Sequence, residues 1–260
     1  GKIEILDDRI NCYLDNDKLQ KKIKETKYLS VGNYCIGKIE NKLKNINKPI
    51  YFIIENFEFE YKIEIEIIGD KNFIEFRNCK FYNGFFSKYS KNLIFKDSFF
   101  MNHVSVIFNR TRYNFGDEAN NVEFINSYFY FIYNEMEPLT TQVCLTINAK
   151  NLKFINSKFQ NKNPNTRIWF DSENTEIINS QLNGGFIKIN TDYLKRKNSK
   201  LDFKEVILEV KNNNSSMLYF GDIESSSIIY NGMDIAKNDK NKHEILEDKE
   251  HSFSKVKKIY

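Results

Sequence analysis

The sequence predicts an all-β fold in which short strands stack in parallel as a solenoid. Three observations predict it: the composition, a repeated phrase and the spacing of its copies. The 260 residues include 35 Asn, 23 Phe and 15 Tyr but only 3 Ala. Ala favours helices, aromatic residues favour strands, and Asn tolerates the left-handed backbone of tight turns. This composition therefore favours many short strands joined by Asn-containing turns.

A nine-residue phrase recurs: Asn, apolar, any residue, aromatic, any residue, Asn or Asp, Ser, any residue, Phe. Its central positions follow one another at intervals of 19 to 30 residues, which suit one turn of a parallel β-solenoid. From the clearest to the most decayed, the copies lie at residues 92–100, 121–129, 151–159, 174–182, 74–81, 52–59, 201–208 and 228–235.

Each copy is expected to place apolar side chains inside and then to turn the chain. Residues two apart on a strand point to the same face, so Phe95, Phe124 and Phe154 should form an internal column. The turn residues should stack as two ladders, one of Ser or Cys and one of Asn or Asp. We expect the second ladder to be buried and hydrogen-bonded from turn to turn: Asn78, Asp97, Asn126, Asn156 and Asn179.

The remaining elements follow from the same pattern. Residues 1–49 are predicted to form an N-terminal cap, with a short helix after Asp15 that carries Leu19 and Ile23 on one face. The repeats occupy residues 50–235. The charged segment 236–260 follows, and residues 254–258 are predicted to begin a further helix. Second strands are expected between the copies, at residues 63–67, 104–108, 143–147, 168–170, 187–189 and 218–220.

The repeat resembles the coil of right-handed parallel β-helix proteins of the pectate-lyase-like kind, over about residues 50–235. The five-residue steps from Phe76 to Phe81 and from Phe124 to Phe129 also resemble pentapeptide-repeat units. A pentapeptide solenoid has uninterrupted fives and coils of constant length, and this chain departs from both. The resemblance implies a single-stranded, right-handed β-helix and says little about activity.

Charge and hydropathy argue against several classes of function. The net charge of +4 and the pI near 8.6 do not fit a dedicated nucleic-acid binder. No apolar run is long enough to span a membrane, and the N-terminus lacks a signal-peptide pattern. We expect a module of a longer protein in a bacterial cytoplasm or, if it is exported, one whose signal has been removed.

Metal and nucleophile chemistry have weak support. The cysteines at 12, 35, 79 and 144 lack zinc-ligand spacing and are expected to be single, buried thiols. No histidine has a Ser or Cys partner at motif spacing. We therefore expect no catalytic residue, no metal and no cofactor. The histidines are His103, His243 and His251.

Carboxylates are the candidates for an enzyme. Glycosidases need two carboxylates that flank a bond, and Asp171 with Glu173, or Asp222 with Glu224, could converge across stacked coils. A structural explanation competes with this one, because Asp171 occupies the same slot as Asn residues of neighbouring coils and would belong to an amide ladder. Those residues are Asn109, Asn148 and Asn190.

The candidate binding residues are those that break the alternation. If Ile168 and Phe170 point inward, Trp169 between them points outward. Exposed large aromatic side chains tend to mark contacts. The alternative is that a loop or the charged C-terminal segment covers this face. The predicted patch has Trp169, Phe186 and Tyr219 at its centre and Arg167 and Lys188 at its rim, with Ile107 and Thr146 continuing the row.

Insertions at residues 109–120, 132–142 and 190–199 lengthen neighbouring corners, and loops on a rigid scaffold often carry binding. The sequence thus favours a non-enzymatic recognition or scaffold module that binds a protein partner, or a carbohydrate, through a surface patch. A carbohydrate-active β-helix enzyme, a polysaccharide lyase or hydrolase, is the alternative.

Overall fold

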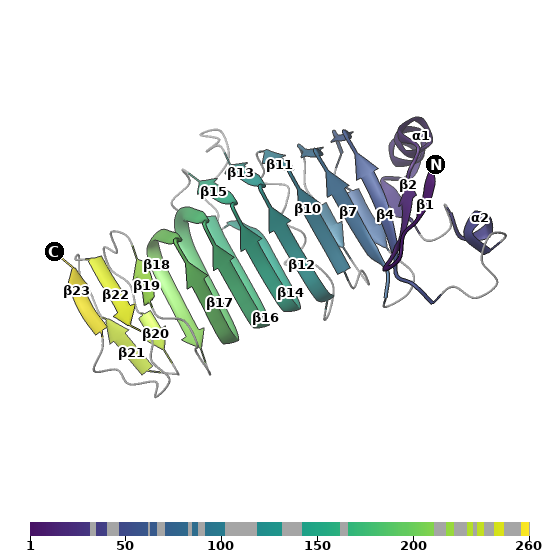
Figure 1. Cartoon of the computed structure of the whole chain (residues 1–260). Coiled ribbons are helices and arrows are strands. Elements are labelled where there is room, and N and C mark those ends of the chain that lie inside the picture. The colour runs from purple at the N-terminus through teal and green to yellow at the C-terminus, as the bar shows by residue number, and fades with distance from the viewer. Residues whose placement is uncertain are drawn as a thin grey trace.

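The computed structural model is predominantly β, with two short helices among the residues that it describes (Figure 1). In this part of the chain, no helix is long and apolar enough to cross a membrane. The described residues are 1–31, 35–40, 47–61, 63–66, 71–82, 85–87, 92–101, 119–131, 142–161, 166–210, 217–220, 228–230, 233–236, 242–246 and 256–259.

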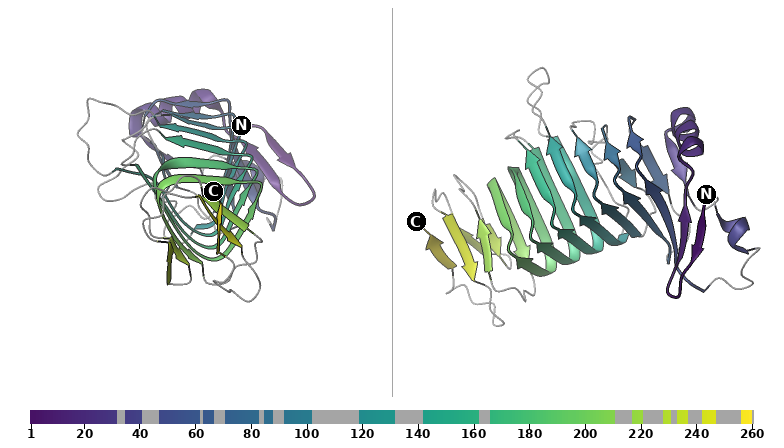
Figure 2. Two further views of the ribbon diagram at one scale, coloured as in Figure 1. Left: turned by 90° about the vertical axis from the view of Figure 1, so that its left-hand side faces the viewer. Right: turned by 45° about the horizontal axis from the view of Figure 1, so that its top comes forward.

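Most strands pair in parallel with the strand one repeat further along the chain, an arrangement compatible with the predicted solenoid. Viewed along the stack, the strands lie on more than one side of a common interior (Figure 2). The longest row consists of β2 (Ile10–Tyr13), β4 (Ile50–Glu55), β7 (Phe73–Arg77), β10 (Asn92–Lys96), β12 (Ala119–Ile125), β14 (Gln142–Ile155), β16 (Thr166–Ile178) and β17 (Gln181–Lys197).

Two further rows of parallel strands lie among the described residues. The row after the Asn-Ser turn consists of β5 (Glu58–Phe59), β8 (Lys80–Phe81), β11 (Phe99–Met101), β13 (Tyr128–Phe131), β15 (Lys158–Asn161), the start of β17 and the start of β18 (Lys200–Val210). The third row consists of β3 (Tyr28–Ser30), β6 (Ile63–Glu66) and β9 (Phe85–Ser87).

Stacked phenylalanine rings form the core, as predicted. Phe95, Phe124 and Phe154 are fully buried, and the ring of Phe124 stacks on its neighbours at 5.0 and 4.9 Å. A second column rises beside the first, with Phe100 and Phe129 at 4.4 Å. Rings of the two columns meet edge to face, and Phe124 and Phe129 lie 5.0 Å apart. Both the stacked and the edge-to-face arrangements are favourable geometries for aromatic pairs.

We expect Phe124→Ala to lower the free energy of unfolding by about 3–5 kcal/mol, because it removes a ring that contacts both columns and leaves a cavity. Urea denaturation followed by circular dichroism measures the loss. Tyr128→Ala, at a half-exposed outward position, is the matched control and should cost less. Equal losses for the two variants would contradict the assigned interior.

The Asn ladder of the turns lies on the surface, which corrects the expectation that it is buried. Asn126, Asn156 and Asn179 are exposed. Their φ angles are 49°, 49° and 47°, in the left-handed region that Asn tolerates better than most residues. Asn is therefore favoured at this position because the backbone must adopt a left-handed φ, while the side chain points to solvent. Some amides still bond along the ladder, as Asn78 Nδ2 does to Asn56 Oδ1 at 2.7 Å.

The Ser ladder is the buried one. The backbone N–H of Ser127 donates to Ser157 Oγ at 3.1 Å, and the N–H of Ser157 donates to Ser180 Oγ at 3.0 Å. The Ser157 hydroxyl lies 3.1 Å from the carbonyl of Phe124 and 3.0 Å from that of Ile155, so it has an acceptor for its own proton. Each hydroxyl thus satisfies a buried backbone N–H of the previous turn.

A third ladder of amides begins the phrase. Asn121 Nδ2 donates to Asn92 Oδ1 at 2.8 Å, and Asn174 Nδ2 donates to Asn151 Oδ1 at 3.0 Å. Asn92 is buried and the other three are partly buried, at the corner that precedes each central strand. Polar ladders therefore bracket the strand on both sides and hold successive copies in register.

Asn156→Leu should lower the free energy of unfolding by about 1–2 kcal/mol, because Leu pays the left-handed backbone penalty that Asn largely avoids. Asn156→Gly is the matched control. It removes the same amide but accepts positive φ, so it should cost clearly less. Thermal unfolding of the two variants makes the comparison. If Gly were as costly as Leu, the amide rather than the backbone would be the origin of the effect.

The structure adds one copy of the phrase that the sequence pattern missed, at residues 193–201. Leu194 pairs with Thr175, Arg196 pairs with Ile177, and Asn198 has a left-handed φ of 49°. The sequence predicts an insertion at 190–199, but residues 190–197 belong to β17 and Asn198 and Ser199 form the next turn. Arg196 stands at the central position, which is apolar in the other copies of this row, and this charged residue hid the copy. Its guanidinium donates to the carbonyl of Ser199.

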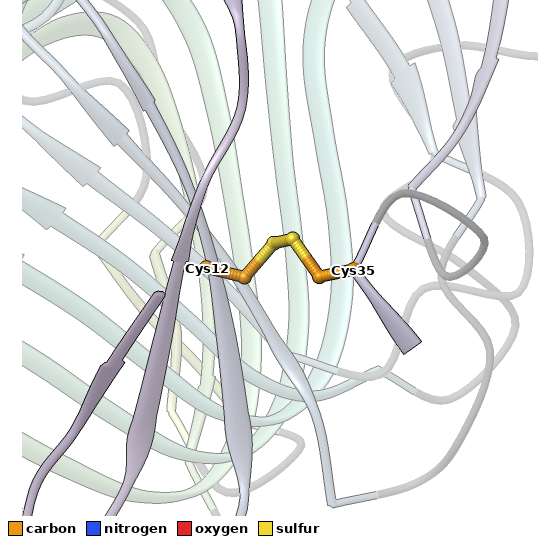
Figure 3. The surroundings of a disulfide bond; sticks show 2 residues. All are labelled: Cys12 and Cys35. Atoms are coloured by element: carbon orange, nitrogen blue, oxygen red, sulfur yellow. A yellow bond between two sulfur atoms is a disulfide. The ribbon is translucent and has the colours of Figure 1, made fainter. Parts of the chain in front are cut away.

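The N-terminal helix is confirmed, and the cysteine expectation is corrected. Helix α1 (Asn16–Thr26) begins after Asp15, whose carboxylate accepts hydrogen bonds from the backbone N–H groups of Asp17 and Lys18. Cys12 and Cys35 form a disulfide (Figure 3), so these two are not single thiols. The bridge joins β2 to the segment just before α2 (Ile36–Glu40). Neither cysteine lies in a sequence motif from which the disulfide could be predicted.

Cys79 is the free, buried thiol among the described residues, in agreement with the expectation for that position. It stands in the Ser ladder, where its backbone N–H donates to Ser98 Oγ at 3.4 Å. Burial raises the pKa of its thiol to about 12, which keeps it protonated at neutral pH. The side chain of Cys144 lies outside the described residues.

The C-terminal part holds strands where the sequence predicts a helix. β23 (Val256–Ile259) overlaps the segment predicted to begin a helix, and it pairs antiparallel with β22 (Lys242–Leu246). β22 also pairs antiparallel with β19 (Met217–Phe220).

Two further antiparallel pairs lie among the described residues. At the N-terminus, β1 (Ile3–Ile5) pairs with β2, and later in the chain β20 (Ile228–Tyr230) pairs with β21 (Met233–Ala236). The sequence expectations at 104–108, 109–118, 132–141, His103, His251, Asp222 and Glu224 lie outside the described residues.

Candidate binding surface

Trp169 lies on the outer side of β16. Its neighbours Ile168 and Phe170 are buried at 1% and 0% exposure, whereas Trp169 is half-buried. Lys188, directly opposite on β17, holds its Nζ 4.7 Å from the centroid of the Trp169 ring. Such a cation–π contact contributes about 0.5–1 kcal/mol at an exposed site and positions both side chains.

Two further predicted residues share this face. Phe186 is half-buried on β17, two residues before Lys188, and its backbone pairs with Arg167 of β16. Thr146 of β14 pairs with Trp169 and continues the row on the other side. We call Thr146, Trp169, Phe186 and Lys188 the Trp169 surface. The side chain of Arg167 lies outside the described residues, as does Ile107.

The backbone of Tyr219 is on a different row, so the structure does not bring it to the Trp169 surface. Phe220 pairs with Leu201, which itself stacks on Leu182 in the row after the Asn-Ser turn. In the stack, Ile187 of β17 pairs with Val206 of β18, so β18 continues the row that holds the Trp169 surface. The missed copy at 193–201 is one reason, because the segment 201–208, which the sequence predicts as the next copy, instead holds the strand after the Asn-Ser turn and then the strand beside Ile187. The last predicted copy, 228–235, is also wrong, because β20 and β21 pair antiparallel there.

A polar cavity of about 470 Å³ adjoins the Trp169 surface. It lies where β14, β16 and β17 bend, two residues after Thr146, Trp169 and Lys188. Asn190 Nδ2 donates to Asp171 Oδ1 at 3.4 Å, so Asp171 takes part in the amide ladder that the sequence suggested. The residues that line the cavity are Asn148, Ala149, Lys150, Asp171, Ser172, Glu173, Asn190, Thr191 and Asp192.

The carboxylates in this cavity do not form a metal site. Asp171 and Glu173 are both exposed, on either side of the buried Ser172. Within the part of the chain that the structure describes, no group of three or more His, Cys, Asp or Glu residues is placed to hold a metal ion. The arrangement offers hydrogen-bond acceptors along the bend.

Sequence reasoning missed a second aromatic surface, on the outer side of β11, β13 and β15. The rings of Phe99 and Tyr128 stack at 5.5 Å, and those of Tyr128 and Tyr130 lie 6.0 Å apart. Tyr128 donates to Gln160 Oε1 at 2.9 Å, and Lys158 lies over its ring at 5.9 Å. The signal was present in the phrase itself, where the position after Ser is aromatic in two copies.

A buried carboxylate lies on the outer side of β7. Glu75 is fully buried, and its Oε1 accepts from Arg77 Nε at 2.7 Å and pairs with Lys96 Nζ at 3.0 Å. Burial by itself would raise the pKa of Glu75, but the hydrogen bonds from Arg77 and Lys96 outweigh it, so the pKa lies below its ordinary value. Arg77 also pairs with Glu55 at 3.1 Å, which extends the network to β4.

Because the folded-state pKa of Glu75 is depressed, the stability it contributes is present above the unfolded pKa, about 4.3, and is lost as the pH falls through the folded value. Glu75→Gln should lower stability near neutral pH and flatten the acid limb of the stability profile. Urea midpoints measured from pH 7 down to pH 3 test this. Glu58→Gln, in an exposed pair with Lys80, is the control and should change the profile less. Parallel profiles for wild type and Glu75→Gln would exclude the assigned pairing.

Comparisons of the chain with protein-family models, with curated proteins and with solved structures gave no match.

Proposed function

We propose that the chain is a right-handed, single-stranded parallel β-helix that serves as a non-enzymatic recognition module and binds a protein partner through the Trp169 surface. The parallel pairing from repeat to repeat supports the helix, and parallel crossovers in proteins are almost always right-handed. The five-residue steps between rings that meet edge to face, as from Phe124 to Phe129, support the likeness of single turns to pentapeptide-repeat units.

The observation that carries the proposal is the half-exposed Trp169 held by Lys188 on a regular sheet. Trp is among the side chains most enriched in the residues that dominate protein interfaces. A large ring on a rigid strand loses little conformational entropy on binding, because it is already ordered. Phe186 adds apolar area beside it, and the lysine supplies a polar rim.

A carbohydrate-active enzyme is the second candidate, and the polar cavity beside the Trp169 surface favours it. Asp171 and Glu173 line that cavity, as a hydrolase with two carboxylates would require. The amide ladder weighs against this role, since Asn190 engages Asp171 in the same way that amides pair elsewhere in the stack. We therefore place the enzyme second.

The compartment is also a proposal. The sequence alone favoured the cytoplasm, with export as the alternative. The Cys12–Cys35 disulfide supports the alternative, because disulfides persist in oxidising compartments and are rare in the cytoplasm.

Trp169→Ala should abolish capture of a partner while leaving the melting temperature nearly unchanged, because the ring lies outside the core. The test uses a photo-crosslinking residue at Phe186 in the source cells, with and without Trp169→Ala. Tyr61→Ala, which removes an aromatic ring that is 40% exposed in another part of the chain, is the control and should leave the crosslink intact. A crosslink that survives Trp169→Ala would contradict the proposal. Polysaccharide cleavage that disappears in Asp171→Asn would instead favour the enzyme.

A further inference from the structure

A row of alternating charges crosses four stacked strands on the outer side of the longest sheet. Glu123 of β12 pairs in register with Lys153 of β14. Lys153 pairs with Glu176 of β16, and Glu176 with Lys195 of β17. In stacking order the row therefore reads Glu, Lys, Glu, Lys. All four side chains reach the surface, where Lys195 is exposed and the others are partly exposed.

An apolar row runs beside the charged one. Ile125, Ile155 and Ile178 stack in register two residues further along the same strands, and Lys197 follows them on β17. These isoleucines are half-buried and point outward, since the residues between the two rows, such as Phe124 and Phe154, are buried in the core. The two rows define what we call the ladder face.

The order of charges makes the ladder face complementary to itself. A two-fold axis parallel to the strands, placed between β14 and β16, brings two copies face to face and reverses the stacking order of one. Glu123 then meets Lys195 of the second copy, and Lys153 meets its Glu176. All four charges find opposite partners, while Ile155 and Ile178 meet across the axis. An isologous contact of this kind uses the same patch on both subunits.

We propose that the ladder face is a homodimer interface and that its occupant is a second copy of this chain with the opposite stacking order. The isoleucine row forms the apolar centre of the contact, and the Glu–Lys row fixes its register, because a shift by one strand would place like charges opposite each other. The Trp169 surface lies across the bend of β14, β16 and β17 and is not used by this contact.

Charge pairing within one chain explains only part of the pattern. Lys153 Nζ lies 3.9 Å from Glu123 Oε1 in the same chain, and neighbours of opposite charge stabilise adjacent strands. The pairing of Glu123 with Lys195 is different. Their strands are three steps apart in the stack, roughly 14 Å at the usual strand spacing, so the two side chains do not meet within one chain.

Because Glu123 and Lys195 do not meet within one chain, exchanging their charges distinguishes contacts between two copies from contacts within one. Lys195→Glu should weaken dimerisation roughly tenfold or more, because each of two contacts then brings two glutamates together. Adding Glu123→Lys should restore the dimer, since the introduced lysine of one copy then meets the introduced glutamate of the other. Interactions within one chain predict the opposite, because the double variant places a lysine beside Lys153 and a glutamate beside Glu176. Lys150→Glu, at an exposed position outside the ladder face, should leave the dimer unchanged.

Sedimentation equilibrium of the whole chain at low salt measures the dissociation constant of each variant, with circular dichroism melting curves as the check on folding. A wild-type dimer that weakens with added salt, is lost in Lys195→Glu and returns in the double variant would support the proposal. A wild type that stays monomeric at every concentration, or a double variant weaker than Lys195→Glu, would overturn it. The wild-type measurement decides this even if a variant fails to fold.

Discussion

The Asn-Ser turn is the constraint on which the rest of the structure depends. Each turn redirects the chain within two residues, with a left-handed φ at the first and, in most copies, a buried Ser or Cys at the second. The hydroxyl of Ser157 accepts from the backbone of one turn and reaches the carbonyl of Phe124 in the previous repeat. A buried N–H without a partner costs about 1–3 kcal/mol, so every turn is tied to its neighbours. Register errors are therefore expensive at each step.

Fixed register has a direct consequence for packing. When successive turns superpose, the same phrase position recurs at the strand spacing, and identical rings stack. Phe76, Phe95, Phe124 and Phe154 follow one another at 4.9 to 5.0 Å. The same register aligns residues on the outer side, where it produces ladders of amides and rows of alternating charge. The Asn-Ser turn thus determines both the stacked rings of the core and the rows on the surface.

The residues that could be predicted are those whose role depends on the phrase alone. The inward column and the outward direction of Trp169 follow from strand alternation. The copy at 193–201 keeps the turn residues Asn198 and Ser199, but the pattern misses it because the charged Arg196 stands at the central position, which is apolar in the other copies. Without this copy, the row of Trp169 is extended to Tyr219 instead of to β18. The exposure of the Asn ladder depends on the direction of the turn, and the Cys12–Cys35 bridge depends on how the N-terminal segment folds back. Neither is encoded in local spacing.

The bend at Asn148, Asp171 and Asn190 separates the outer side of β14, β16 and β17 into two surfaces of different chemistry. Before the bend, one large ring and a lysine offer a single anchor of the kind that a foreign partner can bury. After it, repeated isoleucines and alternating charges offer no unique feature but match their own reversed order. A repetitive surface is best matched by another repetitive surface with the same spacing, and a second copy of the chain has that spacing by construction. The two contacts can therefore coexist, and a dimer through the ladder face would present two Trp169 surfaces at once, which raises avidity for any partner that reaches both.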